Sequence, residues 1–168
     1  MNNKYVKEIL PYIWIVLFLV FIKVFIVSPI RVNGDSMYST LHDGDIMILN
    51  KTIYHFTDIR RFDIVVVRTK HSFIIKRIIG LPGDKVEYKD NLLYINGSKL
   101  DEQYTREVMD DYNIEELGST VVPANCYFVL GDNRKISADS RVYGFIKQKD
   151  IVGRAKTIIF PFNRIGIK

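Results

Sequence analysis

Apolar residues are concentrated near the start of the chain. Residues 9–30 are almost wholly apolar, and Lys23 is their one charged member. As a helix they would extend about 33 Å at ~1.5 Å per residue, which is enough to cross the hydrocarbon core of a bilayer. The pattern therefore predicts one N-terminal transmembrane helix, with residues 1–30 forming a cytoplasmic tail and a membrane anchor.

A cleavable signal peptide is the competing interpretation of this apolar segment. Such peptides end in a pattern of small residues at the cleavage site, and Phe25, Val27 and Pro29 are wrong for that role. We therefore favour a retained, single-pass anchor in the cell membrane. Lys4 and Lys7 precede it and favour a cytoplasmic N-terminus, because positive charges tend to stay on that side.

Short β-like runs replace the apolar segment beyond residue 30. They are separated by Gly, Pro, Asn and Asp, and Asn96-Gly97 is a strong hairpin signal. The runs are residues 46–49, 63–68, 71–79, 85–89, 92–95, 121–122, 127–130 and 151–160. We predict that residues 31–168 form one all-β domain of mainly antiparallel sheets. Residues 101–117 are too polar for a core and are predicted as a loop or a short surface helix.

The charge of the chain is uneven along its 168 residues. The net charge is +5, yet residues 101–118 hold seven acidic residues against one arginine. A basic remainder is compatible with nucleic acid or with anionic lipid. The sequence has no zinc-finger spacing and no Lys/Arg-rich arm, so we expect the lipid bilayer as a partner and no nucleic acid.

Ser36 is the candidate nucleophile, because it lies in the turn-like residues 32–41 just after the apolar segment. A serine hydroxyl needs a base to take its proton. His42 beside Asp43 is too close in sequence to form the required line of hydrogen bonds easily. The single Cys126 has no nearby histidine, and we interpret it as a small hydrophobic residue on a strand.

Lys76 is the better candidate base. A free lysine has a pKa near 10.4, and burial lowers it by up to about 3–5 units because desolvation penalises the charged form. On a strand Lys76 points to the same side as Ile74 and Ile78, so it interrupts an apolar row. The alternative is that the strand twists and Lys76 reaches solvent.

Three segments resemble type I signal peptidases in their residues, order and spacing. They are residues 33–41, residues 76–84, and residues 131–141 followed by Gly144. The apolar N-terminal segment and the ending 160–166 also match, so the resemblance covers essentially the whole chain. Lys76 stands where the endoplasmic-reticulum branch carries a histidine, which makes the resemblance bacterial in type.

The resemblance implies a fold, an activity and a substrate. The fold is the all-β fold of signal peptidases and repressor-type proteases, with an N-terminal transmembrane helix. The catalytic domain lies outside the cytoplasm and cleaves signal peptides from exported precursor proteins. Small side chains, typically alanine, are preferred at the first and third positions before the cut. No metal or cofactor is implied.

The resemblance also implies roles for individual residues. Ser36 would be the nucleophile and Lys76 the general base, while Ser137 would orient the lysine amine. Four residues would support the site: Asp139, Arg141, Arg77 and Asp132. Four would line the substrate pockets: Val32, Leu41, Ile74 and Ile75.

Two positions depart from the usual family pattern. Ser39 stands where a proline is common, and Gly34 stands where some members have a serine that helps to hold the oxyanion. The oxyanion hole would then rely on backbone donors that include the N–H of Ser36.

Two other functions use the same residues. A decayed relative would bind precursors at the membrane without cleaving them, but the intact Ser36 and Lys76 argue against decay. A self-cleaving repressor-type protease shares the Ser-Lys chemistry. It is disfavoured because the apolar segment occupies the N-terminus and no DNA-binding domain is present.

Overall fold

The computed structural model of the chain describes residues 3–70, 72–105 and 108–168. Its helices are α1 (Asn3–Phe21) and α2 (Ser140–Tyr143), with shorter turns at η1 (Ile22–Ile26), η2 (Ile53–His55), η3 (Ile114–Leu117), η4 (Gln148–Asp150) and η5 (Phe162–Arg164). Its strands are β1 (Val27–Arg31), β2 (Ile46–Asn50), β3 (Ile64–Arg68), β4 (Phe73–Gly80), β5 (Val86–Lys89), β6 (Leu92–Ile95), β7 (Ser98–Leu100), β8 (Tyr112–Asn113), β9 (Cys126–Leu130), β10 (Ile146–Lys147), β11 (Ile151–Phe160) and β12 (Gly166–Ile167).

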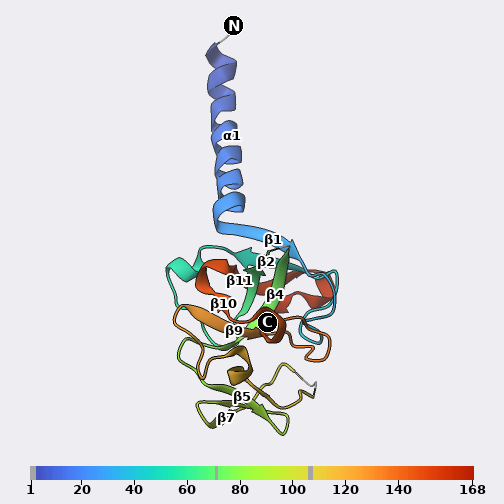
Figure 1. Ribbon diagram of the computed structural model, residues 1–168. Coiled ribbons are helices and arrows are strands. Elements are labelled where there is room, and N and C mark those ends of the chain that lie inside the picture. Colours follow the sequence, from blue (N-terminus) through green and yellow to red (C-terminus); the bar gives the residue numbers. More distant parts are fainter. Residues whose placement is uncertain (1–2, 71, 106–107) are drawn as a thin grey trace.

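The strands form two antiparallel sheets. The larger sheet has the order β1-β2-β11-β3-β4-β9-β10, with β12 paired to β11. The smaller sheet has the order β7-β6-β5-β8 and lies at the end of the molecule away from α1 (Figure 1). The prediction of a mainly antiparallel β fold is therefore confirmed.

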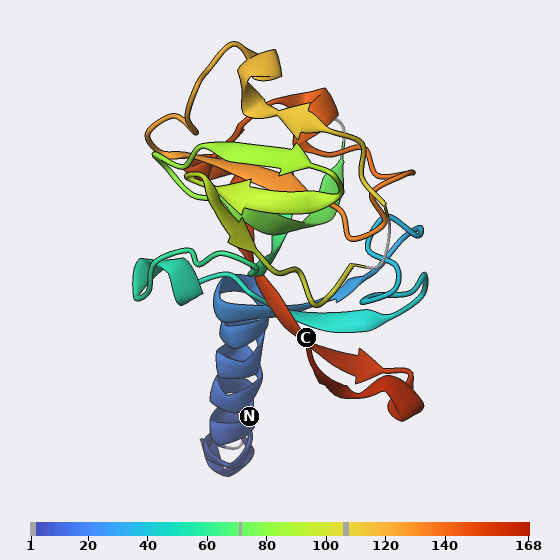
Figure 2. The ribbon, with the colours of Figure 1, turned by 90° about the horizontal axis from the view of Figure 1, so that it is seen from below.

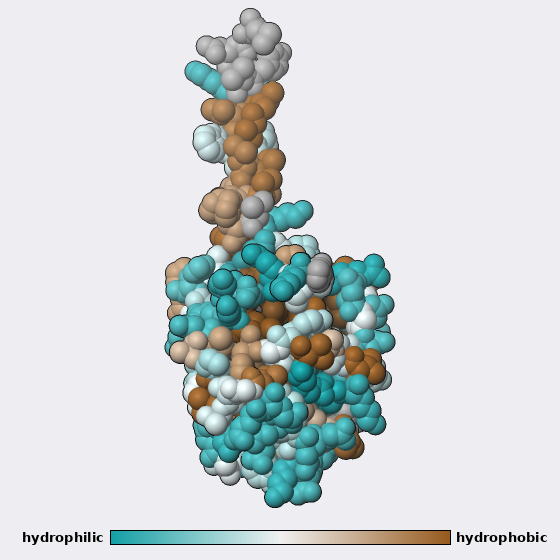
Figure 3. Space-filling model, in the orientation of Figure 1, coloured by the Kyte–Doolittle hydropathy of each residue, from teal (hydrophilic) through white to brown (hydrophobic). Residues whose placement is uncertain are grey.

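Helix α1 projects from the β unit as an isolated column, seen from the side in Figure 1 and from below in Figure 2. Its apolar side chains are exposed around the helix, and in Figure 3 it forms a brown shaft above a largely teal body. No helix within the described ranges combines the length and the apolar character needed to cross a bilayer. The predicted transmembrane helix is therefore not confirmed.

Contrary to the prediction, the end of the apolar segment is not an α-helix. Helix α1 ends at Phe21, η1 is a π-helical turn, and the chain then enters strand β1. Val27 pairs with Asn50 of β2 and Arg31 pairs with Ile46. Residues 27–30 therefore belong to the larger sheet, because pairing with a distant strand satisfies their backbone groups.

Part of the acidic segment is buried, contrary to the prediction. Met109 and Ile114 pack in the core beneath the smaller sheet, against residues that include Phe128. Its fold combines strand β8 with the 3₁₀ turn η3, in which Asn113 caps the first turn and Gly118 ends it at a φ of +77°. The described residues of this segment, 101–105 and 108–118, are thus neither a simple loop nor a helix lying on the surface.

Strands β3, β4 and β9 lie side by side in the larger sheet, and their side chains fill its core. Val65, Ile78 and Val129 are fully buried. In β4 the residue opposite Val65 is Lys76, so the sheet carries a lysine into this apolar layer. The central strand β4 therefore fixes the backbone position from which the Lys76 side chain extends.

Candidate active site

Ser36 and Lys76 meet although they are forty residues apart in the sequence. Ser36 lies in the turns that connect β1 to β2, and Lys76 lies in the middle of β4. The Nζ atom of Lys76 is 2.7 Å from the Oγ atom of Ser36, within hydrogen-bonding distance. The structure thus pairs the hydroxyl with an amine that is held by a central strand.

Lys76 is buried, and only 3% of the residue is exposed. Burial is the main cause that lowers the pKa of its amine to about 8. Asp139 and Asp132 act in the opposite direction and raise the pKa, whereas Arg141 lowers it. The alternative in which Lys76 reaches solvent is wrong, and its amine is available in the neutral form at mildly alkaline pH.

Ser137 lies close to this pair. Its hydroxyl is buried and has no hydrogen-bond partner among the described residues, so the expected bond to the Lys76 amine is not formed in this structure. Gly131 separates Ser137 from Ser36, because a Cβ atom on Gly131 would collide with both the Ser137 Oγ and the Ser36 carbonyl oxygen. Only glycine allows the two segments to approach this closely.

Asp139 holds the third motif together. Its fully buried carboxylate accepts hydrogen bonds from the Gly131 N–H at 3.1 Å and from the Arg141 guanidinium at 2.9 Å. Arg141 also donates to the carbonyl oxygens of Arg134 and Ser137. These bonds fix the backbone on both sides of Ser137.

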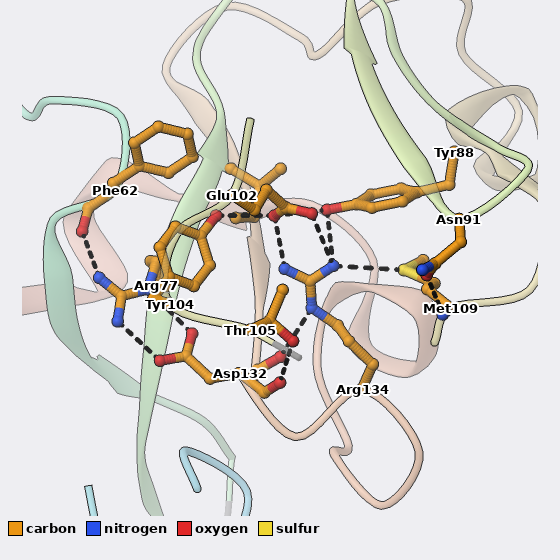
Figure 4. Close-up of polar contacts among 12 residues, drawn as sticks. Phe62, Arg77, Tyr88, Asn91, Glu102, Tyr104, Thr105, Met109, Asp132 and Arg134 are labelled. Atoms are coloured by element: carbon orange, nitrogen blue, oxygen red, sulfur yellow. Dashed lines mark hydrogen bonds and ion pairs between the residues drawn. The ribbon is translucent and has the colours of Figure 1, made fainter. Parts of the chain in front are cut away.

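Arg77 and Asp132 form a buried bidentate pair, which is the geometry that guanidinium and carboxylate groups favour. The two bonds measure 2.8 Å and 2.6 Å. Arg77 also donates to the carbonyl oxygen of Phe62 and to the hydroxyl of Thr40, four residues after Ser36. The ring of Tyr104 covers the guanidinium, with its centre 3.9 Å from the Cζ atom (Figure 4). This pair therefore connects β4, the third motif and the turn that carries Ser36.

Arg134 and Glu102 form a second buried ion pair, to which the sequence analysis assigned no role. The guanidinium of Arg134 donates to Glu102 at 2.6 Å and to the hydroxyl of Tyr88 at 2.7 Å. Glu102 also accepts a hydrogen bond from Tyr104 (Figure 4). The pair docks the start of the acidic segment against the third motif. No signal in the sequence points to this pair, because Arg134 lies 32 residues from Glu102.

A small cavity of about 100 Å³ lies beside Ser36 and Lys76. Of the four predicted pocket residues, Val32, Ile74 and Ile75 line it. Leu41 is fully buried in the core next to it and does not line the cavity. Three of the four residues predicted to line a pocket therefore do line the cavity beside Ser36 and Lys76.

The other candidate residues lie elsewhere or are otherwise engaged. The ring of His42 stacks on Tyr38 and approaches the Arg164 guanidinium at 3.2 Å. Cys126 is half-buried at the start of β9, as the sequence indicated. His71 lies outside the described residues.

Comparison with known proteins identifies a family. Residues 3–160 match the family described as signal peptidase, peptidase S26. The chain is 43% identical to signal peptidase I of Bacillus caldolyticus, with 88% of this chain and 87% of the relative covered. It is 38% identical to signal peptidase IB of Staphylococcus aureus (strain COL), with 94% and 92% covered.

A solved structure supports the same assignment. The crystal structure of a signal peptidase I from Enterococcus faecalis V583 matches with a TM-score of 0.55 and 41% identity, covering 58% of this chain and 97% of that chain. Since the family match spans nearly the whole sequence and the relatives are similar over most of their length, the chain belongs to the signal peptidase family, peptidase S26, and is a serine endopeptidase.

Proposed function

We propose that this chain removes signal peptides from exported precursor proteins by means of a Ser36–Lys76 dyad. The observation that carries the proposal is the 2.7 Å approach of the Lys76 amine to the Ser36 hydroxyl, combined with a lysine pKa lowered to about 8. A neutral amine in contact with a serine hydroxyl has the arrangement of a general base with its nucleophile.

The reaction follows from this geometry. The Oγ of Ser36 bonds to the scissile carbonyl carbon while its proton moves to the Nζ of Lys76. When the tetrahedral intermediate collapses, the ammonium of Lys76 gives that proton to the leaving amine. Lys76, neutral again, takes a proton from the water that attacks the acyl-enzyme carbonyl, and returns that proton to the Oγ of Ser36 as the ester bond breaks. The backbone N–H of Ser36 contributes to the oxyanion hole.

Ser137 positions the lysine amine in this proposal. An unpartnered buried hydroxyl costs about 1–3 kcal/mol, and the Oγ of Ser137 has no partner among the described residues. In the proposed reaction it accepts a hydrogen bond from the Lys76 amine once that amine holds the extra proton. Asp139 and Arg141 fix the backbone around Ser137, while Arg77 and Asp132 fix the turn that carries Ser36.

The small cavity beside the dyad receives the side chain before the cut. Its volume of about 100 Å³ and its apolar wall of Val32, Ile74 and Ile75 suit an alanine rather than a large residue. Leu41 acts from behind this wall, through its packing with Val32. A small residue directly before the cut is therefore preferred, and the resemblance to the family implies a small residue at the third position as well.

We also propose that the N-terminal segment attaches the chain to the cell membrane in a single pass. The support is the run of exposed apolar side chains from Ile9 to Phe21, which has no protein surface to cover it. The N-terminal tail would lie in the cytoplasm and the β unit outside it. The boundary lies near Ile26, where the larger sheet begins, rather than at residue 30.

The proposed reaction can be tested with purified full-length protein in detergent. A precursor whose signal peptide ends in Ala-x-Ala is added, and the products are identified by mass. We expect one cut directly after this sequence, and no cut with Ser36→Ala or Lys76→Ala. Appreciable turnover by either variant would remove the dyad, and binding of the precursor without cleavage would favour the decayed relative.

A further inference from the structure

A second and larger cavity lies away from Ser36 and Lys76. Its volume is about 850 Å³, and four lysine or arginine side chains line it: Lys51, Arg68, Lys147 and Lys149. His55 lines it as well, and none of the described side chains in its wall is acidic. A concave surface with one sign of charge attracts ligands of the opposite sign, so an anionic ligand is indicated.

The wall of this cavity also has an apolar part. Ile59 is buried, and Ile151 and Val152 of β11 are partly buried beside it. Asp63 lies behind the wall, where it already accepts a hydrogen bond from Tyr54 and pairs with Arg154. The cavity therefore suits a ligand with a negative group and a less polar body.

The cavity lies close in space to the end of the apolar N-terminal segment. The N–H of Lys51 donates to the carbonyl oxygen of Ile26 at 2.9 Å, and Ile26 follows the exposed Phe25. In Figure 1 the teal segment around η2 and the orange-red segment around η4 lie at the end of the β unit that faces α1. Next to His55, the ring of Phe56 is 83% exposed. Exposed aromatic rings and basic side chains together are typical of a lipid interface.

We propose that this cavity binds the headgroup of an anionic phospholipid, with the phosphate held by the lysines and the glycerol part against the apolar wall. The inference rests on the membrane attachment proposed above. Bound lipid holds the β unit at the membrane surface. Arg68 additionally lies 5.9 Å from the ring of Phe73, which lines the cavity beside Ser36, so one contact connects the walls of the two cavities.

Native mass spectrometry of the full-length protein in detergent micelles tests this site. Phosphatidylglycerol or phosphatidylcholine is titrated in, and an apparent Kd is obtained for each. Phosphatidylglycerol should bind more tightly to the unaltered protein. The double variant Lys147→Gln/Lys149→Gln should bind it roughly 25-fold more weakly, at about fivefold per lysine. The double variant Lys147→Arg/Lys149→Arg keeps both charges and should keep the original affinity. Among the described residues, Phe73 contacts Arg68 and the dyad is formed by Lys76 and Ser36, so neither substituted lysine belongs to these pairs.

Lys89→Gln/Lys99→Gln is the matched control, because it removes the same charge from exposed positions on β5 and β7 at the opposite end of the β unit. This variant should bind phosphatidylglycerol as the unaltered protein does. An equal loss in both double variants, or no loss in either, would overturn the proposal. Thermal unfolding of each variant separates lost binding from lost structure. If the double glutamine variant unfolds, the single variants Lys147→Gln and Lys149→Gln provide the test, each with an expected loss of about fivefold in affinity.

Two further measurements assign the ligand. Soluble glycerol 3-phosphate that binds as tightly as the lipid would make the cavity a site for free phosphate, and an acidic peptide that binds more tightly would make it a protein-docking site. Either result overturns the lipid assignment. Cleavage of a short Ala-x-Ala peptide by the unaltered protein in detergent is measured separately. Cleavage without lipid selectivity would refute only the lipid site, whereas failed cleavage would refute the dyad.

Discussion

Lys76 sets the dependence of turnover on pH. Only its neutral amine can accept the Ser36 proton, and its pKa is lowered to about 8. Turnover should therefore rise as the pH increases through about 8, by about tenfold between pH 7 and the plateau. Initial rates on an Ala-x-Ala peptide between pH 6 and pH 10 measure this limb. A profile that is flat over the whole range would contradict a lysine base.

Ser137→Ala should lower kcat and leave KM almost unchanged. The hydroxyl lies close to Ser36 and does not itself line the substrate cavity. In the proposed reaction it bonds to the protonated amine of Lys76, and losing a hydrogen bond to a charged group costs about 1.5–3 kcal/mol, which corresponds to roughly ten- to a hundredfold in rate. Steady-state kinetics on the same peptide separate the two constants.

Asp139→Asn provides the contrast for this variant, because its carboxylate holds the backbone through Gly131 and Arg141. It should mainly lower the temperature of unfolding. If Ser137→Ala kept the kcat of the unaltered protein, or only raised KM, Ser137 would be a turn residue without a role in positioning the lysine.

At the scale of elements, the buried ion pair between Glu102 and Arg134 helps to hold the acidic segment in place. Glu102→Gln leaves the guanidinium of Arg134 buried without its counter-charge, and breaking such a pair costs about 3–5 kcal/mol. Glu115→Gln is the matched control, since Glu115 and Lys85 form an exposed pair at 3.4 Å that is worth about 1 kcal/mol or less. Urea unfolding of the two variants should differ clearly. Equal stability would mean that the segment docks by its apolar residues alone.

Local pattern predicted most of the strands and the long helical start, because each alternation or apolar run is a property of neighbouring residues. It failed where partners are distant in the sequence. Residues 27–30 continue the apolar run, but their pairing with β2 makes them a strand. Glu102 looked like a surface acid, because its partner Arg134 lies 32 residues away.

The candidate site shows the same division. Ser36 and Lys76 were predicted from residue type and motif, and the structure brings them into contact. Gly131 and Arg134 belong to the third motif, yet their roles depend on the close approach of separate segments and on a buried counter-charge. Leu41 was expected in the pocket wall, but side-chain direction in a turn cannot be deduced from the sequence, and it packs in the core.

At the scale of the whole molecule, the proposed topology can be tested on intact cells. Protease added to protoplasts should digest the β unit beyond Ile30, because exported precursors emerge on that side. Immunoblotting with antibodies against the N-terminal and C-terminal ends follows the fragments, and a cytoplasmic protein serves as the control for intact membranes. Complete protection of the β unit would place it in the cytoplasm.

The buried lysine has a further consequence, for the folding equilibrium. In the unfolded chain its amine keeps a proton up to about pH 10.5, whereas in the folded protein it does so only up to about 8. Between these values folding releases a proton, so the free energy of unfolding rises with pH and is reduced at neutral pH by roughly 3 kcal/mol. Lys76→Met should therefore unfold at a higher temperature than the unaltered protein at pH 7, with the difference shrinking towards pH 10.5. The amine that is proposed to activate Ser36 thus lowers the free energy of unfolding at neutral pH.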